Sequence, residues 1–545
     1  MSKIRIEYMD VSPGAKENFV ATSYDAEQIT NLNEFQNYNS IVRNYSNPIE
    51  EYLTILDGSS IPIPKSPNGK NIGFLSKRLS DSEGNFDDPI KIYFESVGEH
   101  TSKGIMLTFD DDNNIFPTKI NVKWYRGIDV ISENDYFPES PVFIIENEVE
   151  NFDGISFVFY SINMPNNRLR FRYIEYGYPR NFIGKELKNV SVDQKIDPIS
   201  SKISINTVDF SIKTSGNIDY VFQNKQPILA YFDENLISKT FITSASRKSK
   251  ESWTIRSEDY IGILNEIPFF GGIYENESAY YILTEISNAS RVPFQIEQSL
   301  QRVFLSGYIP FSNCGDALMQ VAFASGYVVD TSNSEFVKIF KLNDESSKII
   351  TKNRIMQGQT IKENKKVTGV SLYYHAYYPI EEKHVAYESE KSGIGNNIFV
   401  KFSEPLHDLK ISNGKIVSRE TNFAIINANK NCVLEGKKYR HDKANKTKNN
   451  SSVLYGQLEN VISIENATLV SETNIDKILD LCYNYLTKTT EIQEKIVERK
   501  TDSKIYLGDI VKTETSFVGD LCGIVVDQKY NLNGGIIVKD TQIMA

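Results

Sequence analysis

Short runs of β-branched and aromatic residues, separated by turn-forming residues, recur along most of this chain and constrain its fold more than any other feature. Between residues 73 and 178 the runs are Ile90–Phe94, Gly104–Phe109, Lys119–Tyr125, Val142–Ile145, Gly154–Tyr160 and Arg168–Ile174. Short strands at this spacing are typical of a β-sandwich or jelly roll. We therefore predict a jelly roll over residues 67–181, preceded by an irregular N-terminal arm at 1–66 that packs on this jelly roll.

The sequence pattern changes near Tyr178, and the region 182–360 combines strand patterns with helical patterns. Strands are predicted at Ser204–Ile212, Ile218–Phe222, Pro227–Phe232, Lys239–Ser244 and Trp253–Ser257, and a hairpin at Tyr327–Val329 with Phe336–Leu342. Helical spacing of apolar residues predicts helices at 277–289 and 312–325. Ser312 or Asn313 can cap the second helix, and Gly326 suits its left-handed C′ position.

A second β-rich region, 361–545, contains one strong helix pattern. Asn474 can cap this helix, and its apolar face is Ile475, Ile478, Leu479, Cys482, Tyr483 and Leu486. Near the C-terminus, Asn533-Gly534-Gly535 predicts a hairpin turn because residues with positive φ are tolerated there. The predicted fold class is therefore mainly β with α+β segments.

Size and charge exclude several classes of protein. A chain of 545 residues predicts more than one domain. Of the net charge of -11, residues 1–180 carry -10, from 27 acidic and 17 basic residues. Neither part is basic enough to indicate binding of duplex nucleic acid. No apolar run is long enough to predict membrane insertion, and the first residues lack a signal-peptide pattern, so we expect folding in a cytoplasm.

The run Asp110-Asp111-Asp112-Asn113-Asn114 stands between two strand patterns and has two interpretations. It is either the turn between the strands or a loose cation site. An EF-hand loop is excluded, because the aspartates are consecutive and neither a central glycine nor a distal glutamate follows. We favour the turn.

Two basic patterns also leave alternatives open. Arg168, Arg170 and Arg172 alternate with apolar residues, so they predict either an anion-binding strip or a solvated face paired with carboxylates, which we favour. The tract from Lys437 to Lys448 predicts an exposed loop, a contact for an acidic partner or, less readily, a nucleic-acid site.

No catalytic or metal-binding motif is present. The five histidines form neither H-E-x-x-H nor a Cys/His zinc pattern, and nucleophile-elbow and phosphate-loop motifs are absent. The four cysteines predict reduced, mostly buried thiols. Cys432 and His441 could form a thiol–imidazole pair in principle, although chance explains their presence better. We expect no enzyme activity, no cofactor and no bound metal.

Three aromatic residues of the predicted jelly roll bear on ligand binding. Trp124 lies inside a strand pattern, which favours a core position over a sugar-binding platform. Tyr136 and Phe137 fall in a predicted loop, where exposed aromatic rings could stack on a sugar. They are the candidate glycan-facing residues.

The segments "GIMLTFDDDNNIFPTKINVKWYRG" and "PVFIIENEVENFDGISFVFYSINMPNNRLRFRYIEYG" resemble the discoidin-type jelly rolls found in tail proteins of bacteriophages of Gram-positive hosts. In that family a strand ending Thr-Phe-Asp leads through a polar turn to a strand ending Trp-Tyr. The resemblance covers residues 104–177 and implies that the Asp run is the turn. Such domains often bind glycans, but their variable loops transfer no ligand residue to this chain.

A second resemblance covers residues 183–545 and concerns baseplate hub proteins of contractile phage tails and phage-tail-like particles such as R-type bacteriocins. The ordered markers are Asp197-Pro198-Ile199, Gln226-Pro227, Asp259–Gly262, Phe270-Gly271-Gly272, Ser306–Pro310 with the following helix, "NATLVSETNIDKILDLCYNYL" and "LGDIVKTET".

The hub resemblance implies a homotrimer in which each subunit contributes two tube-like β-barrel domains. Three subunits would form a ring that adapts a six-fold tail tube to a three-fold central spike. The implied partners are other copies of this chain, the tail tube protein, the spike protein, other baseplate proteins and the tape measure protein. Cell-wall glycan is the further partner that the jelly roll would add. Such a protein assembles in the bacterial cytoplasm and leaves by lysis within a particle.

Overall fold

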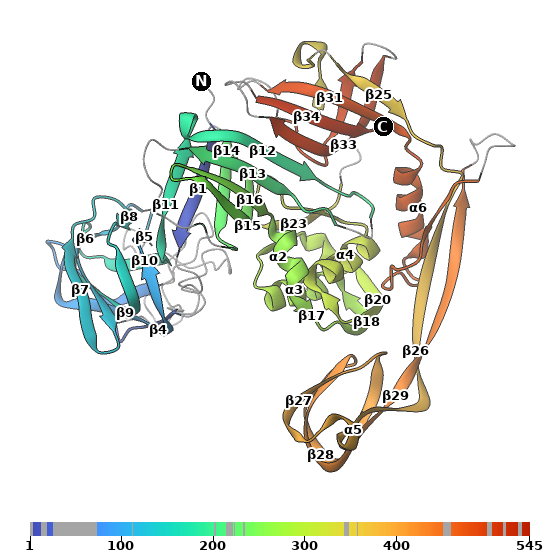
Figure 1. Cartoon of the computed structure of the whole chain (residues 1–545), viewed down its shortest axis with the longest axis horizontal. Helices are drawn as coiled ribbons and strands as arrows, with labels where there is room; N and C mark the ends of the chain where they lie inside the picture. The colour runs from blue at the N-terminus through green and yellow to red at the C-terminus, as the bar shows by residue number, and fades with distance from the viewer. Residues whose placement is uncertain are drawn as a thin grey trace, which may run out of the picture. The chain divides into compact units, whose positions relative to one another are not determined.

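The computed structural model describes residues 4–11, 19–25, 74–111, 113–200, 203–213, 222, 224–232, 235–342, 348–356, 358–450, 459–498, 504–515, 519–531 and 537–545. Antiparallel sheets dominate these residues and the helices are few (Figure 1), which confirms the mainly-β class. The chain divides into two compact units. Unit 1 comprises 1–6, 183–217 and 229–545, and unit 2 comprises 7–182 and 218–228.

Unit 2 contains two antiparallel sheets. One has the order β2 (Phe19–Thr22), β4 (Asn85–Ser102), β9 (Val149–Ile162), β6 (Pro117–Arg126) and β7 (Asp129–Tyr136). The other has the order β3 (Phe74–Leu79), β10 (Arg168–Glu175), β5 (Ile105–Phe109) and β8 (Val142–Ile145). Both sheets contribute to one apolar core, in which Trp124 is fully buried as predicted. Two sheets that share a core in this way form a β-sandwich.

The N-terminal arm is not irregular throughout. Residues 4–11 and 19–22 form β1 (Ile4–Val11) and β2, and β2 pairs with β4 of the sandwich through Phe19–Ser96 and Ala21–Phe94. The alternation of buried Phe19 and Ala21 with exposed residues explains this strand. The prediction of an irregular arm is therefore wrong for these residues, and residues 26–66 lie outside the described part.

The main sheet of unit 1 joins strands that are far apart in sequence. Its order includes β14 (Pro227–Phe232), β15 (Asn235–Ser249), β16 (Ser252–Glu258), β13 (Thr207–Lys213), β12 (Leu187–Lys195), β33 (Asp520–Asn531), β34 (Ile537–Met544), β31 (Thr490–Glu498) and β25 (Thr360–Glu363). β32 (Ile510–Glu514) and β24 (Lys348–Ile350) also belong to this sheet in unit 1, whereas most residues of β1 and of β11 (Gly177–Ile183) belong to unit 2. The seam between the early and late strands is the β12–β33 pair, where Val192 is opposite Tyr530.

A helical region packs around a large apolar core in unit 1. Its helices are α2 (Tyr260–Glu266), α3 (Ala279–Ser290), α4 (Cys314–Ser325) and α6 (Ile475–Leu486), and its short strands are β17 (Pro268–Phe269), β18 (Gly272–Ser278), β19 (Phe294–Ile296), β20 (Phe304–Ile309), β21 (Ser312–Asn313), β22 (Val328–Asp330) and β23 (Val337–Phe340). Three 3₁₀ turns occur at η1 (Gly184–Glu186), η2 (Gln298–Arg302) and η3 (Lys352–Arg354). The predicted hairpin is the antiparallel β22–β23 pair.

Helix ends follow the predicted capping chemistry in one case and not in another. Asn313 accepts a hydrogen bond from Asp316 N, and Gly326 ends α4 with φ 76°, as predicted. Asn474 occupies the N-cap position of α6, but its side chain does not cap the helix. Its side-chain amide donates instead to Ala324 O and Leu469 O, so these carbonyl groups replace a backbone N–H of the first helical turn as its partners.

The remaining strands of unit 1 form a long ribbon with a small β subdomain at one end (Figure 1). β26 (Gly369–Glu388) and β29 (Phe423–Asn449) pair along most of their lengths. β27 (Gly395–Lys401), β28 (Leu406–Arg419) and the short α5 (Ser389–Ser392) surround a separate ten-residue core, and β30 (Val461–Ile464) pairs with the start of β26. The predicted strand at 218–222, apart from Phe222, and the predicted turn at 533–535 lie outside the described residues.

Candidate functional site

The acidic run belongs to a buried ion-pair network in the sandwich. Asp110 and Ile115 form a β-bridge that closes the turn between β5 and β6, so the turn interpretation is confirmed. Arg170 Nη1 lies 2.6 Å from Asp110 Oδ2, and Arg172 Nη2 lies 2.7 Å from Asp110 Oδ1. Arg172 also pairs with Asp111. The carboxylates of Asp110 and Asp111 therefore face two guanidinium groups, and Asp112 lies outside the described residues.

This network argues against a cation site at Asp110 and Asp111. A metal ion would compete with Arg170 and Arg172 for the same oxygens, and it would sit beside their positive charges. Within the described residues, no group of three or more His, Cys, Asp or Glu side chains could hold a metal ion.

The prediction of a solvated arginine face is wrong for two of the three arginines. Arg170 and Arg172 are 4% and 3% exposed. The register of β10 shifts between Arg168 and Arg170 against β3, and between Phe171 and Tyr173 against β5. Leu169 and Phe171 lie in the core, and Arg170 and Arg172 share the other face of the strand. These two arginines are buried because Asp110 and Asp111 cover that face, and the carboxylates compensate the desolvation of the guanidinium groups. The predicted pairing of arginine with carboxylate is confirmed.

The two candidate glycan-facing residues are in different environments. Tyr136 is the last residue of β7 and not part of a loop, and its ring packs against Phe143 with 6.3 Å between centroids. Burial raises the pKa of the Tyr136 phenol. Phe137 follows the strand and is 63% exposed. Phe137 is therefore the more accessible of the two rings.

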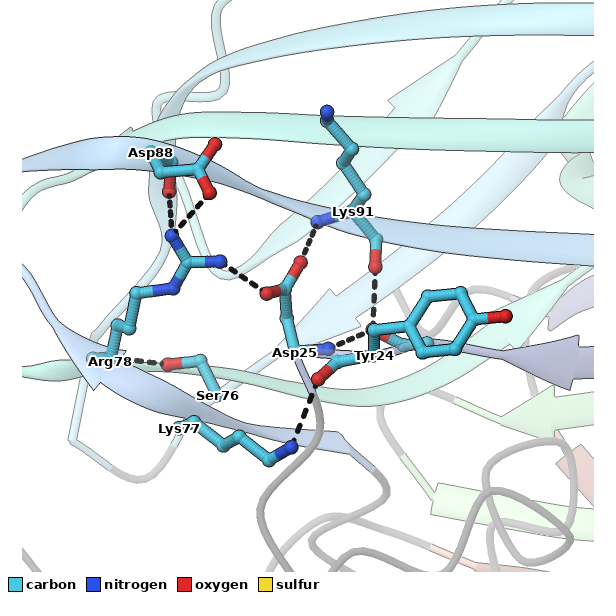
Figure 2. Close-up of polar contacts among 8 residues, drawn as sticks. Tyr24, Asp25, Ser76, Lys77, Arg78, Asp88 and Lys91 are labelled. Atoms are coloured by element: carbon cyan, nitrogen blue, oxygen red, sulfur yellow. Dashed lines mark hydrogen bonds and ion pairs between the residues drawn. The ribbon is translucent and has the colours of Figure 1, made fainter.

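A polar cluster that the sequence did not indicate anchors the segment after β2 (Figure 2). Asp25 Oδ2 accepts from Lys91 N at 3.0 Å, and its other oxygen pairs with Arg78. Arg78 also pairs with Asp88 at 2.7 Å, and this bond lowers the pKa of the Asp88 carboxyl. Lys77 Nζ donates to Tyr24 O at 3.0 Å. The cluster holds residues 24 and 25 against β3 and β4, and it leaves the Tyr24 ring 93% exposed.

The basic tract is strand and not the predicted loop. Residues 437–448 lie within β29 and face carboxylates of neighbouring segments. Lys437 pairs with Glu381 at 2.7 Å, and Lys438 pairs with Glu382 at 3.0 Å. Lys443, Lys446 and Lys448 pair with Glu465, Asp476 and Asp480 at 2.9, 2.8 and 2.6 Å. Because these pairs neutralise much of the positive charge, the tract is a weak candidate for binding phosphate groups.

The structure does not bring the thiol and imidazole candidates together. Cys432 and His441 lie nine residues apart on the same strand, about 30 Å along its axis at the usual rise per residue. All four cysteines are free, and Cys314, Cys432 and Cys482 are buried as predicted. Burial raises the pKa of Cys314 to about 11 and that of Cys482 to about 12, so neither is an activated nucleophile.

Asp259 is a fully buried carboxylate that joins three parts of unit 1. It accepts from Ile261 N at 3.0 Å, from Asn206 N at 3.1 Å and from the Thr331 hydroxyl. Burial raises its pKa to about 7. A perturbed carboxyl can indicate catalysis, but Asp259 is enclosed and both of its oxygens accept hydrogen bonds from the protein. Its contacts support a structural role.

An aromatic cluster joins the small β subdomain to the helical region of unit 1. The rings of Phe270 and Phe423 are 4.5 Å apart, and those of Phe270 and Phe399 are 5.6 Å apart. Lys401 Nζ lies 3.8 Å from the centre of the Phe311 ring. Phe270 and Phe399 remain 43% and 44% exposed. This cluster combines an apolar surface with a cation, which is typical of a protein contact.

No family model matches the sequence, and no curated protein matches it. Among solved structures, the chain is similar to the tail protein from Neisseria meningitidis MC58, at 8% identity, TM-score 0.43, covering 67% of this chain and 94% of that one. It is also similar to the 43 kDa tail protein of prophage MuSo2 from Shewanella oneidensis, at 8% identity, TM-score 0.43, covering 67% and 95%. A third similar structure is the Francisella PdpA–VgrG complex, at 8% identity, TM-score 0.35, covering 81% and 58%. TM-scores below 0.5 do not establish a shared fold.

None of the helices in the described part of the chain combines enough length with enough apolar character to cross a bilayer.

Proposed function

We propose that this chain is a structural hub protein of a contractile tail or tail-like particle. In this proposal three copies form a ring that adapts a six-fold tube to a three-fold spike. The chain would assemble in the bacterial cytoplasm and be released by lysis as part of the particle. Its partners would be other copies of itself, the tube and spike proteins, other baseplate proteins and the tape measure protein. It would carry out no catalysis.

The single observation that carries this proposal is the continuous main sheet of unit 1. Early strands β12 to β16 and late strands β31 to β34 join edge to edge at the β12–β33 seam. One chain therefore presents two strand groups side by side, which is what a hub needs if three subunits are to match a six-fold tube. The hub resemblance implies two tube-like β-barrel domains in each subunit, and the two strand groups support that part of the proposal.

The chemistry of the described residues supports a binding role over a catalytic one. The buried carboxylate Asp259 is fully hydrogen-bonded, and the buried thiols have raised pKa values. Lysines of the ribbon are paired with carboxylates. We therefore expect unit 1 to act by binding other proteins through complementary surfaces. A hub carries load, so it needs large and well-packed contacts between subunits.

The test is the oligomeric state of the full chain and its place in a particle. Mass photometry of the purified protein, alone and mixed with the tube and spike proteins of the same particle, should give three copies of the 62.1 kDa chain. Electron microscopy of the particle with this chain labelled should place the label at the tube–spike junction. A protein that stays monomeric under all these conditions, or a label elsewhere in the particle, would contradict the proposal.

A second candidate function is a glycan-binding adhesin acting through the sandwich of unit 2. The observation that favours it is the exposed Phe137 ring at the end of β7. Binding of the full chain to cell-wall glycan arrays should be lost in Phe137→Ala and kept in Tyr24→Ala, which removes another exposed ring from the same unit. Equal binding by both variants, or no binding by the wild type, would exclude this use of Phe137.

A further inference from the structure

Two histidines lie edge to edge where the β26–β29 ribbon leaves the helical region of unit 1. His375 Nδ1 and His441 Nε2 are 2.9 Å apart, and the two rings are nearly parallel with centroids 5.1 Å apart. Tyr377 also stacks on His441, at 4.6 Å. His375 is 3% exposed, whereas His441 is open to solvent. Protons can therefore reach the pair from the His441 side.

The pair sits at the root of the ribbon. β26 pairs with β30 as far as Leu372, and His375 N then donates to Val470 O at 2.8 Å. Within the described residues, the later part of β26 pairs with β29 alone. The loop at 465–470 is itself held by α4, because Gln320 Nε2 donates to Asn466 O at 2.7 Å. His375 is thus the last point at which this side of the ribbon is fastened to that loop.

Hydrogen-bond partners determine where the protons are. His375 Nε2 lies 3.0 Å from Glu465 O, and a carbonyl oxygen only accepts, so this nitrogen carries a hydrogen. In the neutral ring His375 Nδ1 is then an acceptor. His441 Nε2 must donate to it, which leaves His441 Nδ1 as the basic nitrogen of the pair.

Burial opposes protonation of the pair more than the surrounding charges do. β29 presents Arg440, Asp442 and Lys443, the loop presents Glu465, and the phenols facing the pair are Tyr373, Tyr377 and Tyr308. Lys443 is paired with Glu465 at 2.9 Å, and Arg440 with Asp442 at 3.0 Å, so the carboxylates already have partners. Burial, and then the nearby His441, lower the pKa of His375 to about 4. Burial also lowers the pKa of His441.

We propose that the His375–His441 pair is an acid-sensitive latch that fastens the root of the β26–β29 ribbon to the 465–470 loop. The first proton enters at His441 Nδ1 and leaves the bond between the rings intact. The second proton must occupy His375 Nδ1, where it meets the Nε2–H of His441. Two imidazolium ions then face each other at hydrogen-bond distance, the bond is lost and the root opens. The latch does not depend on the proposed function.

The test is amide hydrogen exchange of the full-length protein at pH 7 and pH 4, corrected for the intrinsic rate of exchange. Between pH 7 and pH 4, the protection factors of peptides that cover 373–379 and 439–445 should fall at least about tenfold more than those of α4 peptides. The opened root binds protons that the closed root excludes, so low pH favours the opened state. Equal loss in the root and in α4 would overturn the proposal.

Variants separate the latch from general acid sensitivity. His375→Gln keeps an N–H donor toward Glu465 O but takes up no proton, so the extra loss of protection at pH 4 should disappear. His384→Gln, on the same strand, is the matched control and should behave as the wild type. If His375→Gln fails to fold, His441→Gln decides, since it removes the first protonation site and therefore the positive charge that a second proton on His375 would face. Persistence of the pH step in the folded variant would refute the latch.

Discussion

Removing the Asp110 carboxylate tests the buried network that joins β10 to the turn after β5. Asp110 is fully buried and faces Arg170 and Arg172 at 2.6 and 2.7 Å. Asp110→Ala leaves two buried guanidinium groups with too little negative charge. Breaking one side of a buried ion pair costs about 3–5 kcal/mol, so the free energy of unfolding of unit 2 should fall by that amount. A loss of this size is a large fraction of the stability of one domain.

Asp111→Ala is the matched control, because Asp111 is 26% exposed and its partner Arg172 keeps its ion pair with Asp110. Its loss should cost no more than about 1 kcal/mol, as for other solvent-accessible ion pairs. Trp124 lies in the core of unit 2, and the other tryptophan, Trp253, lies in β16 of unit 1. Urea unfolding followed by fluorescence in a Trp253→Phe background therefore reports on unit 2. Equal costs for the two aspartate variants, or a cost below about 1 kcal/mol for Asp110→Ala, would refute the reasoning.

Three further predictions concern unit 1. The pKa of Asp259 is raised to about 7, so the folded state keeps a proton that the unfolded state releases above about pH 4. The free energy of unfolding should therefore fall by up to about 4 kcal/mol as pH rises from 4 to 7, and urea unfolding of Asp259→Asn should not show this dependence on pH. Gly307 has φ 149°, and a Cβ there would lie 2.2 Å from Thr468 O. Gly307→Ala should therefore lower the thermal unfolding midpoint by several degrees, and an unchanged midpoint would show that the loop at Thr468 can move to accommodate the methyl group. In a gel-shift assay at physiological salt, neither the wild type nor the double variant Lys446→Ala/Lys448→Ala should bind DNA, because both lysines are already paired with carboxylates. A complex that forms with the wild type and weakens in the double variant would restore the nucleic-acid interpretation.

Local patterns predicted the parts of the structure whose determinants are close in sequence. The cap of α4 was predictable because Asn313 and Gly326 act on backbone groups within a few residues. The β22–β23 hairpin and the core position of Trp124 follow from alternation and a short turn. Alternation held for Leu169 and Phe171 of β10, which lie in the core, but it could not show that Asp110 and Asp111 cover the face that carries Arg170 and Arg172.

The candidate site was predicted in part. The sequence selected Asp110, Tyr136 and Phe137 for study, but their surroundings came from the fold. The cluster around Asp25 was not foreseen, because its partners Arg78 and Lys91 lie more than fifty residues away. The sequence does show a series of charged residues on β3 and β4, but it does not show which residues these pair with.

The sequence by itself determined the mainly-β class, the positions of helices α3, α4 and α6, the mostly buried thiols and the turn at Asp110, because each depends on hydrophobic periodicity or on turn chemistry over a few residues. Only the tertiary structure decided that β12 pairs with β33, that the basic tract is a neutralised strand and that His375 meets His441. Each of these depends on which distant segments become neighbours. A strand edge, a lysine or an imidazole is compatible with many partners, and the packing of the whole chain selects one of them.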